Sequence, residues 1–392
     1  MHIIDVKDKR TWRLFHKVPH LIYKNDPLWI TPLESDIRKI FDPSKNKAFR
    51  EGEARCMVLL NKKNKPIGRI AAFIDHGRNK KSDHIKGAIG FFECIHDKQA
   101  ADILFEAAES YLVDKGVQII DGPVNFGERD KFWGLLVKGR YEPIYTETYN
   151  PEYYIDFFEA ADFKPYEKVL TLKGKTLDLP YKKFKESAEK SKEKYGLRVE
   201  FINTKNLRKY VDDFCEVYNV AFKDFPYYKP LTTKMVYNLF KKLKMVIDPK
   251  LACYVYKGDQ PVGFCLLMPE INQFLKGAGG KVNIFTLSGI LFRKFKPGKK
   301  IVKGIAVGIH PDFQGKGVIP ILGDKLYKHA SSHYSYFYLT TIRGLNKKML
   351  NAMSHLDLKI DREHIAYRKI LDSSIAFEDL NFEKVLGEKT ED

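Results

Sequence analysis

The sequence predicts an α/β (α+β) protein of two consecutive domains, each a mixed central sheet flanked by helices. The chain of 392 residues is longer than one hydrophobic core usually supports. With 44% hydrophobic and 30% charged residues, it has the composition of a folded protein. Strand-like and helix-like patterns also follow one another twice in the same order: strand, two helices, hairpin, strand, helix, strand, helix, strand. Together these observations favour an internal duplication.

The first domain is expected to cover residues 1–173. It begins with a strand at 3–6 and helical patterns at 9–23 and 33–41, followed by strands at 55–61 and 66–75 around the turn 62–65. A strand at 88–95 then leads into a helix at 98–115 and a strand at 117–121. Apolar residues recur at helical spacing in 98–115, so one face of that helix is predicted to be buried.

Residues 174–196 are expected to be a lysine-rich linker with one exposed helix, and residues 197–392 the second domain. The second domain shows a strand at 197–202, helices at 207–222 and 232–245, and a hairpin of 252–256 and 262–268. After an insertion come a strand at 303–309, a helix at 318–334, a strand at 336–342, a helix at 346–356 and a strand at 365–371. This order repeats that of the first half.

The two halves also end alike. In the first, a helical pattern ends in Asp162-Phe163-Lys164 before a strand, and in the second Asp357-Leu358-Lys359 stands at the same point of the same order. One such match could arise by chance, but its position in the repeated order makes duplication the better explanation.

Charge and composition exclude several classes of protein. The net charge of +18 would attract phosphates, nucleic acid or an anionic membrane. Most of this charge is lysine scattered among glutamates, and no zinc-knuckle spacing or arginine-rich tract is present, so nucleic acid is not expected as a partner. The start of the chain lacks the pattern of a signal peptide and no apolar run could span a bilayer, which favours a cytoplasmic location. Five cysteines without a CxxC pair indicate neither disulfides nor a metal site.

The segment from Gly308 to Val318 joins a predicted strand to a predicted helix. Glycines at 315 and 317 allow the backbone to approach a ligand closely, and the start of the helix presents unpaired N–H groups. Such a loop binds pyrophosphate. A tight turn without a ligand has the same spacing, and the spacing by itself does not distinguish the two.

This segment resembles motif A of the GNAT acyltransferase superfamily, in which a strand is followed by Val-x-Pro-x-x-(Arg/Gln)-x-x-Gly-x-(Gly/Ala) at the start of a helix. Ile309, Pro311, Gln314 and Gly317 occupy the corresponding places. The duplicated order resembles tandem-GNAT proteins. The resemblance implies acyl-coenzyme A (acetyl-CoA or another acyl-CoA) as co-substrate and no metal. It implies these cofactor-binding residues: Val307, Gly308, Ile309, Gln314, Gly315, Lys316, Gly317, Val318 and Asn346.

The chain departs from the family pattern at two places. Ile319 stands at the last small residue of the motif, and Met353 stands where the family usually has a tyrosine that protonates the leaving thiolate. The catalytic group is therefore left unassigned. The first half has no phosphate loop, because after its third strand it reads His96-Asp97-Lys98, where Asp97 is suited to capping a helix.

Further candidates have ordinary structural explanations. Glu270 and Tyr338 could act as base or acid, but a surface carboxylate and a packed aromatic residue are the simpler interpretations. His329 and His333 have i,i+4 spacing without a visible third ligand, which favours a solvated helix face over a metal site.

The expected function is acyl-CoA-dependent N-acyl transfer, with acetyl as the expected acyl group and an unidentified small-molecule or lipid-like amine as acceptor. The segment 271–303 combines many apolar residues with a basic cluster. This pattern allows peripheral membrane contact through 284–303 and a lipid N-acyltransferase, but a buried insertion with a basic exit is the preferred interpretation. A non-catalytic CoA-binding or scaffold protein, and a ligase that takes an aminoacyl group from tRNA, are competing hypotheses. The sequence does not indicate an oligomeric state.

Overall fold

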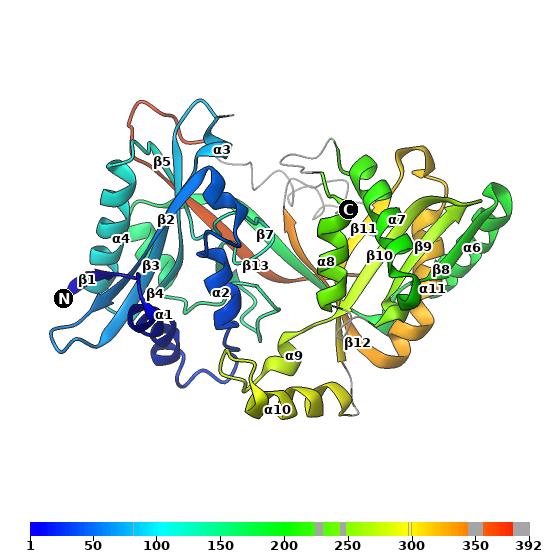
Figure 1. Ribbon diagram of the computed structural model, residues 1–392, viewed down its shortest axis with the longest axis horizontal. Helices are drawn as coiled ribbons and strands as arrows, with labels where there is room; N and C mark the ends of the chain where they lie inside the picture. Colours follow the sequence, from blue (N-terminus) through cyan, green and yellow to red (C-terminus); the bar gives the residue numbers. More distant parts are fainter. Residues whose placement is uncertain are drawn as a thin grey trace, which may run out of the picture.

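The computed structural model describes residues 1–80, 82–223, 230–243, 248–296, 298, 300–343 and 356–378. The strands of both halves form one continuous mixed sheet, with helices on its two faces (Figure 1). The predicted fold class is therefore confirmed.

The helices and strands follow the predicted order closely. The first half contains β1 (His2–Asp5), α1 (Lys9–Ile22), α2 (Glu34–Ile40), β2 (Gly52–Leu60), β3 (Pro66–Asp75), the short α3 (His76–Asn79), β4 (Lys86–Cys94), α4 (Lys98–Val113), β5 (Ile119–Gly122), β6 (Leu135–Lys138), α5 (Tyr154–Ala160) and β7 (Lys164–Lys175). The second contains α6 (Tyr181–Tyr195), β8 (Leu197–Phe201), α7 (Leu207–Ala221), α8 (Thr233–Leu243), β9 (Ala252–Lys257), β10 (Gln260–Pro269), α9 (Asn272–Leu275), α10 (Ile284–Phe295), β11 (Lys300–Ile309), α11 (Val318–His333), β12 (Tyr334–Arg343) and β13 (Lys359–Ile370). Most of the helix predicted at 346–356 lies outside the described residues.

The order of strands across the sheet shows the duplication directly. It reads β1-β2-β3-β4-β5-β13-β7-β12-β11-β10-β9-β8, so the five strands from each edge inward correspond one to one. In both halves the fourth and fifth strands from the edge pair parallel, β4 with β5 and β11 with β12. The strands nearer the edge pair antiparallel, as β2 with β3 and β9 with β10 do. The two halves are related by an approximate two-fold arrangement about the centre of the sheet.

The last strand of each half lies beside a strand of the other half. β13 pairs with β5 from Tyr367 to Ile370, and β7 pairs with β12 from Val169 to Lys175. Between these contacts, β7 and β13 pair antiparallel with each other. The carboxyl-terminal strand is therefore part of the sheet of the first half, and the halves share their central strands.

The two matching chain ends adopt the same backbone geometry. Asp162 and Asp357 both have positive φ angles, 62° and 46°, directly before the strands that start at Lys164 and Lys359. Asp tolerates this left-handed conformation better than most residues. The sequence match at these ends thus reflects the same backbone turn before β7 and before β13. We call these two the exchanged strands, because each pairs with a strand of the other half.

Both faces of each half-sheet are covered. On β3, Ile70, Ala72 and Ile74 pack with α4, whereas Ala71 and Phe73 on the opposite face pack with α1 and α2. On β9 the same alternation directs Tyr254 and Tyr256 towards α7, and Cys253 and Val255 towards α11. Period-2 alternation with apolar residues on both faces is expected for a sheet between helical layers.

Replacement of Tyr367 should destabilise the first half although the residue lies near the end of the chain. Its side chain is 2% exposed in the core of the first half, and its ring centroid lies 5.8 Å from that of Phe158. Tyr367→Ala is expected to cost about 3–5 kcal/mol of unfolding free energy. All three tryptophans lie in the first half, so denaturant unfolding followed by their fluorescence measures this directly.

The matched control is Ile360→Ala on the same strand, where the side chain is 41% exposed. Its expected cost is below about 1 kcal/mol. Equal unfolding midpoints for the two variants would contradict the role of β13 in the first core.

Candidate functional site

β11 and β12 diverge at the carboxyl-terminal end of β11. Their parallel pairing is recorded from Lys300 to Gly304, opposite Tyr334 to Leu339, and stops there. Residues 306–309 continue to pair with β10 on the other side, after an irregularity of the ladder at Ile305. The edge of 305–309 that faces β12 has no strand partner in the part of the chain that the structure describes. It includes the predicted cofactor residues Val307, Gly308 and Ile309.

The loop after β11 presents backbone donors. Gly315 and Gly317 have φ angles of 74° and 76°, and α11 begins at Val318. Within the described ranges, no hydrogen bond is recorded from the N–H groups of Gly315, Gly317 or Val318. Gln314 and Gly315 are exposed, Lys316 is half-buried and Val318 is buried. Free N–H groups at the start of a helix are suited to an anion.

Gly317 has an additional structural reason to be glycine. A Cβ atom at this position would lie 2.6 Å from Ser191 Cβ of α6. The linker helix therefore packs along the first turn of α11, with Ala188 fully buried and the Tyr181 ring stacked on that of Tyr327 at 4.2 Å. The expectation of an exposed linker helix is wrong for this face of α6.

The corresponding divergence in the first half is filled by the chain itself. β4 and β5 pair only from Lys86 to Ala88, and beyond this point the Val124 N–H donates to the Ile89 carbonyl at 2.9 Å. A Cβ atom at Gly90 would collide with the Val124 carbonyl oxygen. Asp97 caps α4 by accepting from the Ala100 N–H, as predicted. This half thus lacks both the free strand edge and the glycine loop.

The two candidate acid and base residues have structural roles. Glu270 is 3% exposed, and its carboxylate accepts hydrogen bonds from the backbone N–H groups of Tyr145, Asn272 and Gln273 at 2.7–2.9 Å. Its prediction as a surface carboxylate is therefore wrong. Tyr338 is 4% exposed and packs near Lys173 and Arg362, as expected for a packed aromatic residue.

His329 and His333 each have a partner within the protein. His329 Nε2 lies 2.7 Å from an Asp248 carboxylate oxygen, and His333 Nδ1 lies 3.0 Å from the His329 carbonyl oxygen. No group of His, Cys, Asp and Glu suited to a metal ion occurs among the described residues. Asn346 and Met353 lie outside the described residues.

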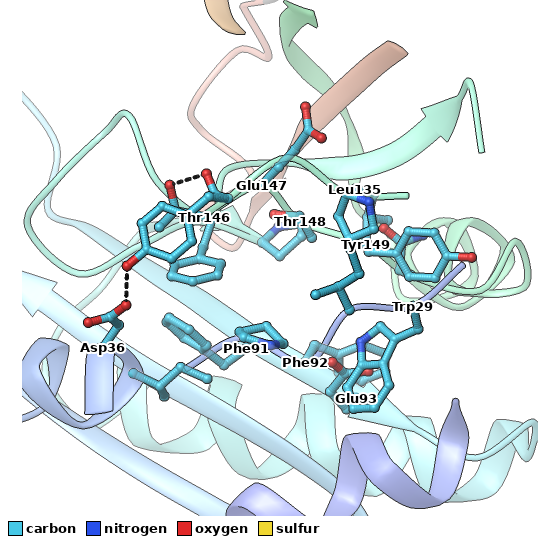
Figure 2. Close-up of a pocket in the computed structure, with 18 of the residues that line it drawn as sticks. Trp29, Asp36, Phe91, Phe92, Glu93, Leu135, Thr146, Glu147, Thr148 and Tyr149 are labelled. Carbon is cyan, nitrogen blue, oxygen red and sulfur yellow. Dashed lines mark hydrogen bonds between the residues drawn. The ribbon is translucent and has the colours of Figure 1, made fainter. Parts of the chain in front are cut away.

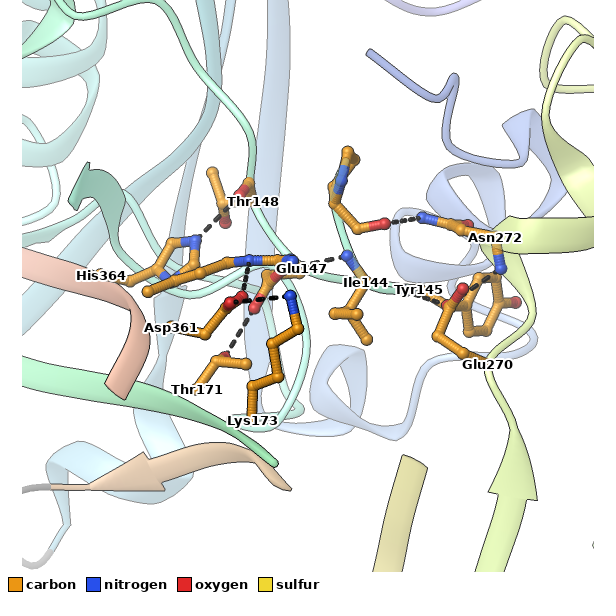
Figure 3. A network of polar contacts seen from close by, with 12 residues as sticks. Ile144, Tyr145, Glu147, Thr148, Thr171, Lys173, Glu270, Asn272, Asp361 and His364 are labelled. Carbon is orange, nitrogen blue, oxygen red and sulfur yellow. Dashed lines mark hydrogen bonds and ion pairs between the residues drawn. The ribbon is translucent and has the colours of Figure 1, made fainter. Parts of the chain in front are cut away.

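A buried charged network joins the two halves at the exchanged strands (Figure 3). The Glu147 carboxylate pairs with Arg362 of β13 and accepts hydrogen bonds from Thr171 Oγ1 at 2.7 Å and from the Ile144 N–H at 3.0 Å. Arg362 also contacts Asp361 at 3.0 Å and is 2% exposed. No sequence signal pointed to this network, because its members are brought together only by the strand exchange.

Lys303 lies where β11 and β12 begin to diverge. It stands opposite Tyr338 in the register, and its Nζ lies 3.4 Å from the Tyr145 carbonyl oxygen. Burial lowers the pKa of Lys303, and this effect outweighs the opposing influence of Glu147 and Glu270. The segment around Tyr145, which belongs to the first half, therefore contacts β11 at the divergence.

On the other side of that segment lies a small cavity of about 60 Å³ (Figure 2). It is lined mainly by aromatic and aliphatic side chains, including Trp29, Phe91, Phe92, Tyr145, Tyr149 and Tyr154. Glu93 in its wall accepts hydrogen bonds from the Tyr23 and Tyr154 hydroxyls at 2.8 and 2.9 Å. Burial raises the pKa of Glu93 despite the nearby Arg69. Its lining includes residues of two turn-like aromatic segments, 122–126 and 149–154, whose sequence suits a cleft lining and a core or turn role equally.

Neutralising Glu147 should destabilise the protein in a pH-dependent way. Burial raises the pKa of this carboxyl group, but Arg362, His364 and the hydrogen bonds outweigh burial and hold it below the ordinary value of 4.5. The stabilisation is therefore complete above about pH 4.5 and is lost as the pH falls through the folded-state pKa. Glu147→Gln should cost about 3 kcal/mol at pH 7, and less at pH 4, in denaturant unfolding.

Glu152→Gln serves as the control, because Glu152 is 84% exposed in its pair with Arg140. Its expected cost is below about 1 kcal/mol. A loss for Glu147→Gln that is the same at pH 7 and pH 4 would argue against the ion pair as its cause.

Comparison with curated proteins finds relatives along most of the chain. A bacterial ceramide synthase from Caulobacter vibrioides is 25% identical over 320 residues, which are 80% of this chain and 82% of that protein. Protein YghO from Escherichia coli is 22% identical over 317 residues, 80% of each chain. No protein-family model matches the chain.

Comparison with solved structures identifies the fold. A GCN5-related glucosamine N-acetyltransferase region of a fungal multi-domain β-N-acetylglucosaminidase matches 94% of the chain, with a TM-score of 0.53 and 12% identity, and the match spans 38% of that protein. A tandem GNAT protein from the clavulanic acid biosynthesis pathway matches 95% of the chain and 99% of its own length, with a TM-score of 0.54 and 7% identity. The chain therefore has the tandem GNAT fold over nearly its whole length.

Proposed function

We propose that the protein is an acyl-CoA-dependent N-acyltransferase whose acceptor is a lipid-like amine. The observation that carries this proposal is the edge of residues 305–309, which has no strand partner among the described residues and leads into N–H groups at the start of α11 that donate to none of them. The edge offers N–H and C=O groups to the pantetheine amides, and the start of α11 offers donors and a positive dipole end to the pyrophosphate. The residues present thus fit the cofactor.

The reaction would be direct attack of the amine nitrogen on the thioester carbonyl carbon. The C–N bond forms, the C–S bond breaks, coenzyme A leaves as the thiol and the nitrogen loses its proton. Holding the two reactants in register supplies much of the acceleration in such a step. Within the described residues we assign no catalytic acid or base. The divergence of β11 and β12 would place the thioester, and the amine would approach it there.

A lipid-like acceptor is favoured by two features. A ceramide is the amide of a long-chain amino alcohol and a fatty acid, so the relationship to a bacterial ceramide synthase supports an acceptor of this chemical class. The aromatic and aliphatic walls of the cavity could contact part of an apolar chain. A hydrocarbon chain gains about 0.8 kcal/mol for each buried CH₂ group, so such a site would prefer long amines to short ones.

Release of free thiol should depend on the acceptor. With a long-chain amino alcohol, we expect steady thiol release from acetyl-CoA or a longer acyl-CoA, and at least tenfold less with a short amine of the same head group. Binding of coenzyme A without turnover for any amine would favour the non-catalytic alternative. Co-purification of RNA with dependence on charged tRNA would favour the ligase alternative.

Binding of coenzyme A itself is tested by Gly315→Glu. A Cβ atom at 315 meets no other atom within 4 Å, so this substitution places a negative charge on the loop without the collision with α6 expected at Gly317. Calorimetry should show an affinity reduced by on the order of a hundredfold or more. Gly279→Glu is the matched control, because Gly279 also has a positive φ, 60°, and open space around it. Unchanged affinity in Gly315→Glu would mean that the loop is only a turn.

A further inference from the structure

α10 is an apolar helix that lies beside α9 but buries none of its own side chains. None of its residues is buried, and the exposed fractions of Ile284, Phe285, Phe292 and Phe295 are 79%, 85%, 67% and 73%. Of the seventeen large hydrophobic side chains exposed in the described ranges, seven lie between Val282 and Phe295. A concentration of exposed apolar side chains of this kind marks an interaction surface.

The first turn of α10 is stabilised by a capping box within the segment itself. The Asn283 side chain accepts hydrogen bonds from the N–H groups of Phe285 and Thr286 at 3.0 Å, and Thr286 completes a capping box. A core-forming helix would bury its phenylalanines. The expectation of a buried insertion is therefore not met by α10, whereas Phe274 and Leu275 of the preceding α9 are buried.

The charged residues of the segment that contains α10 are all basic, although Lys276 and Lys281 pair with Glu142 and Glu34 of the first half. The sequence contains no Asp or Glu from residue 271 to residue 311, and eight lysines and arginines lie between Lys276 and Lys303. Arg293 and Lys294 lie in the last turn of the helix, and Lys296 follows it directly. A second copy of the chain on this face would bring two such basic clusters together, which is unfavourable. An anionic surface would complement them.

We propose that α10 docks on an anionic lipid bilayer and lies in the interface, with its phenylalanines inserted and its basic end at the head groups. A helix of 12 residues is about 18 Å long, too short to cross the hydrocarbon core of about 30 Å. Every helix in the described ranges falls short of the length or apolarity needed to span a bilayer. An apolar face with a basic border is typical of interfacial helices.

The position of α10 connects the bilayer to the cavity. Figure 1 shows the helix at an outer edge of the molecule, away from the sheet. The segment between α9 and α10 contacts the first half, where the Glu34 N–H donates to the Gly280 carbonyl at 2.9 Å. Pro32 and Leu33 on one side, and Asn272 of α9 on the other, line the cavity. This step rests on the proposed function: a lipid-like amine would enter from the membrane to which α10 is bound.

Cosedimentation of the full-length protein with vesicles tests the docking. We expect binding to vesicles of phosphatidylcholine with phosphatidylglycerol, weaker binding to pure phosphatidylcholine, and weakening by salt. The triple variant Phe285→Ser, Phe292→Ser, Phe295→Ser should bind anionic vesicles at least about tenfold more weakly. Leu21→Ser, Val113→Ser, Leu177→Ser is the matched control, since these side chains are 44%, 51% and 69% exposed elsewhere and should leave vesicle binding unchanged.

Two results would overturn the proposal: no binding of the wild type to anionic vesicles at low salt, or equal binding of the wild type and the phenylalanine variant. A wild-type dimer in sedimentation that becomes monomeric in this variant would assign the helix to a second copy instead. Unfolding curves establish that the variants are folded. Vesicle binding without thiol release for any amine would contradict the proposed function but not the membrane docking of α10. The two proposals are therefore tested independently.

Discussion

β7 and β13 pair along most of their length at the middle of the sheet, and each also pairs with a strand that belongs to the other half. This double pairing turns two duplicated units into one hydrogen-bonded sheet. It also places Arg362 and Thr171 where they meet Glu147, and Lys173 of β7 where it pairs with Asp361 of β13, so these buried contacts depend on both exchanged strands. Because a buried charge without its partner is costly, the network strengthens the coupling between the halves.

The same strand arrangement yields different surroundings in the two halves. In the first, the backbone at Val124, just after β5, hydrogen-bonds to Ile89 of β4 and occupies the divergence between the parallel strands. In the second, the edge of 305–309 stays unpartnered among the described residues and continues into the glycine loop. Duplication thus supplied two equivalent gaps, and the segment after β5 closed one of them. The first half instead contributes a cavity with aromatic walls, so cofactor and acceptor would be held by different copies of the same unit.

The sequence predicted the order of elements well, because period-2 and period-3.6 patterns are local and both faces of the sheet are buried. The match of Asp162 with Asp357 correctly indicated the repeat, since it encodes a local backbone conformation. The strand exchange could not be predicted, because it depends on which of two equivalent sheet edges a strand joins. The role of Gly317 shows the same limit: its spacing suits a phosphate loop, and its contact with Ser191 comes from a helix more than a hundred residues away.

The divergence of β11 and β12, the cavity and α10 are connected by two short segments, one around Tyr145 and one around Asn272. The segment around Tyr145 contacts Lys303 at the divergence on one side and lines the cavity on the other. The segment around Asn272 lines the same cavity, and the Asn272 side chain donates to the Pro143 carbonyl at 2.8 Å. Residues 276–283 then lead from α9 to α10. Glu270 ties both segments together through the N–H groups of Tyr145 and Asn272. Because this carboxylate is buried and satisfied by backbone donors, its chemical role is to hold the cavity wall against β11. These contacts connect the segment before α10, through Asn272 and Glu270, to the wall between the cavity and β11.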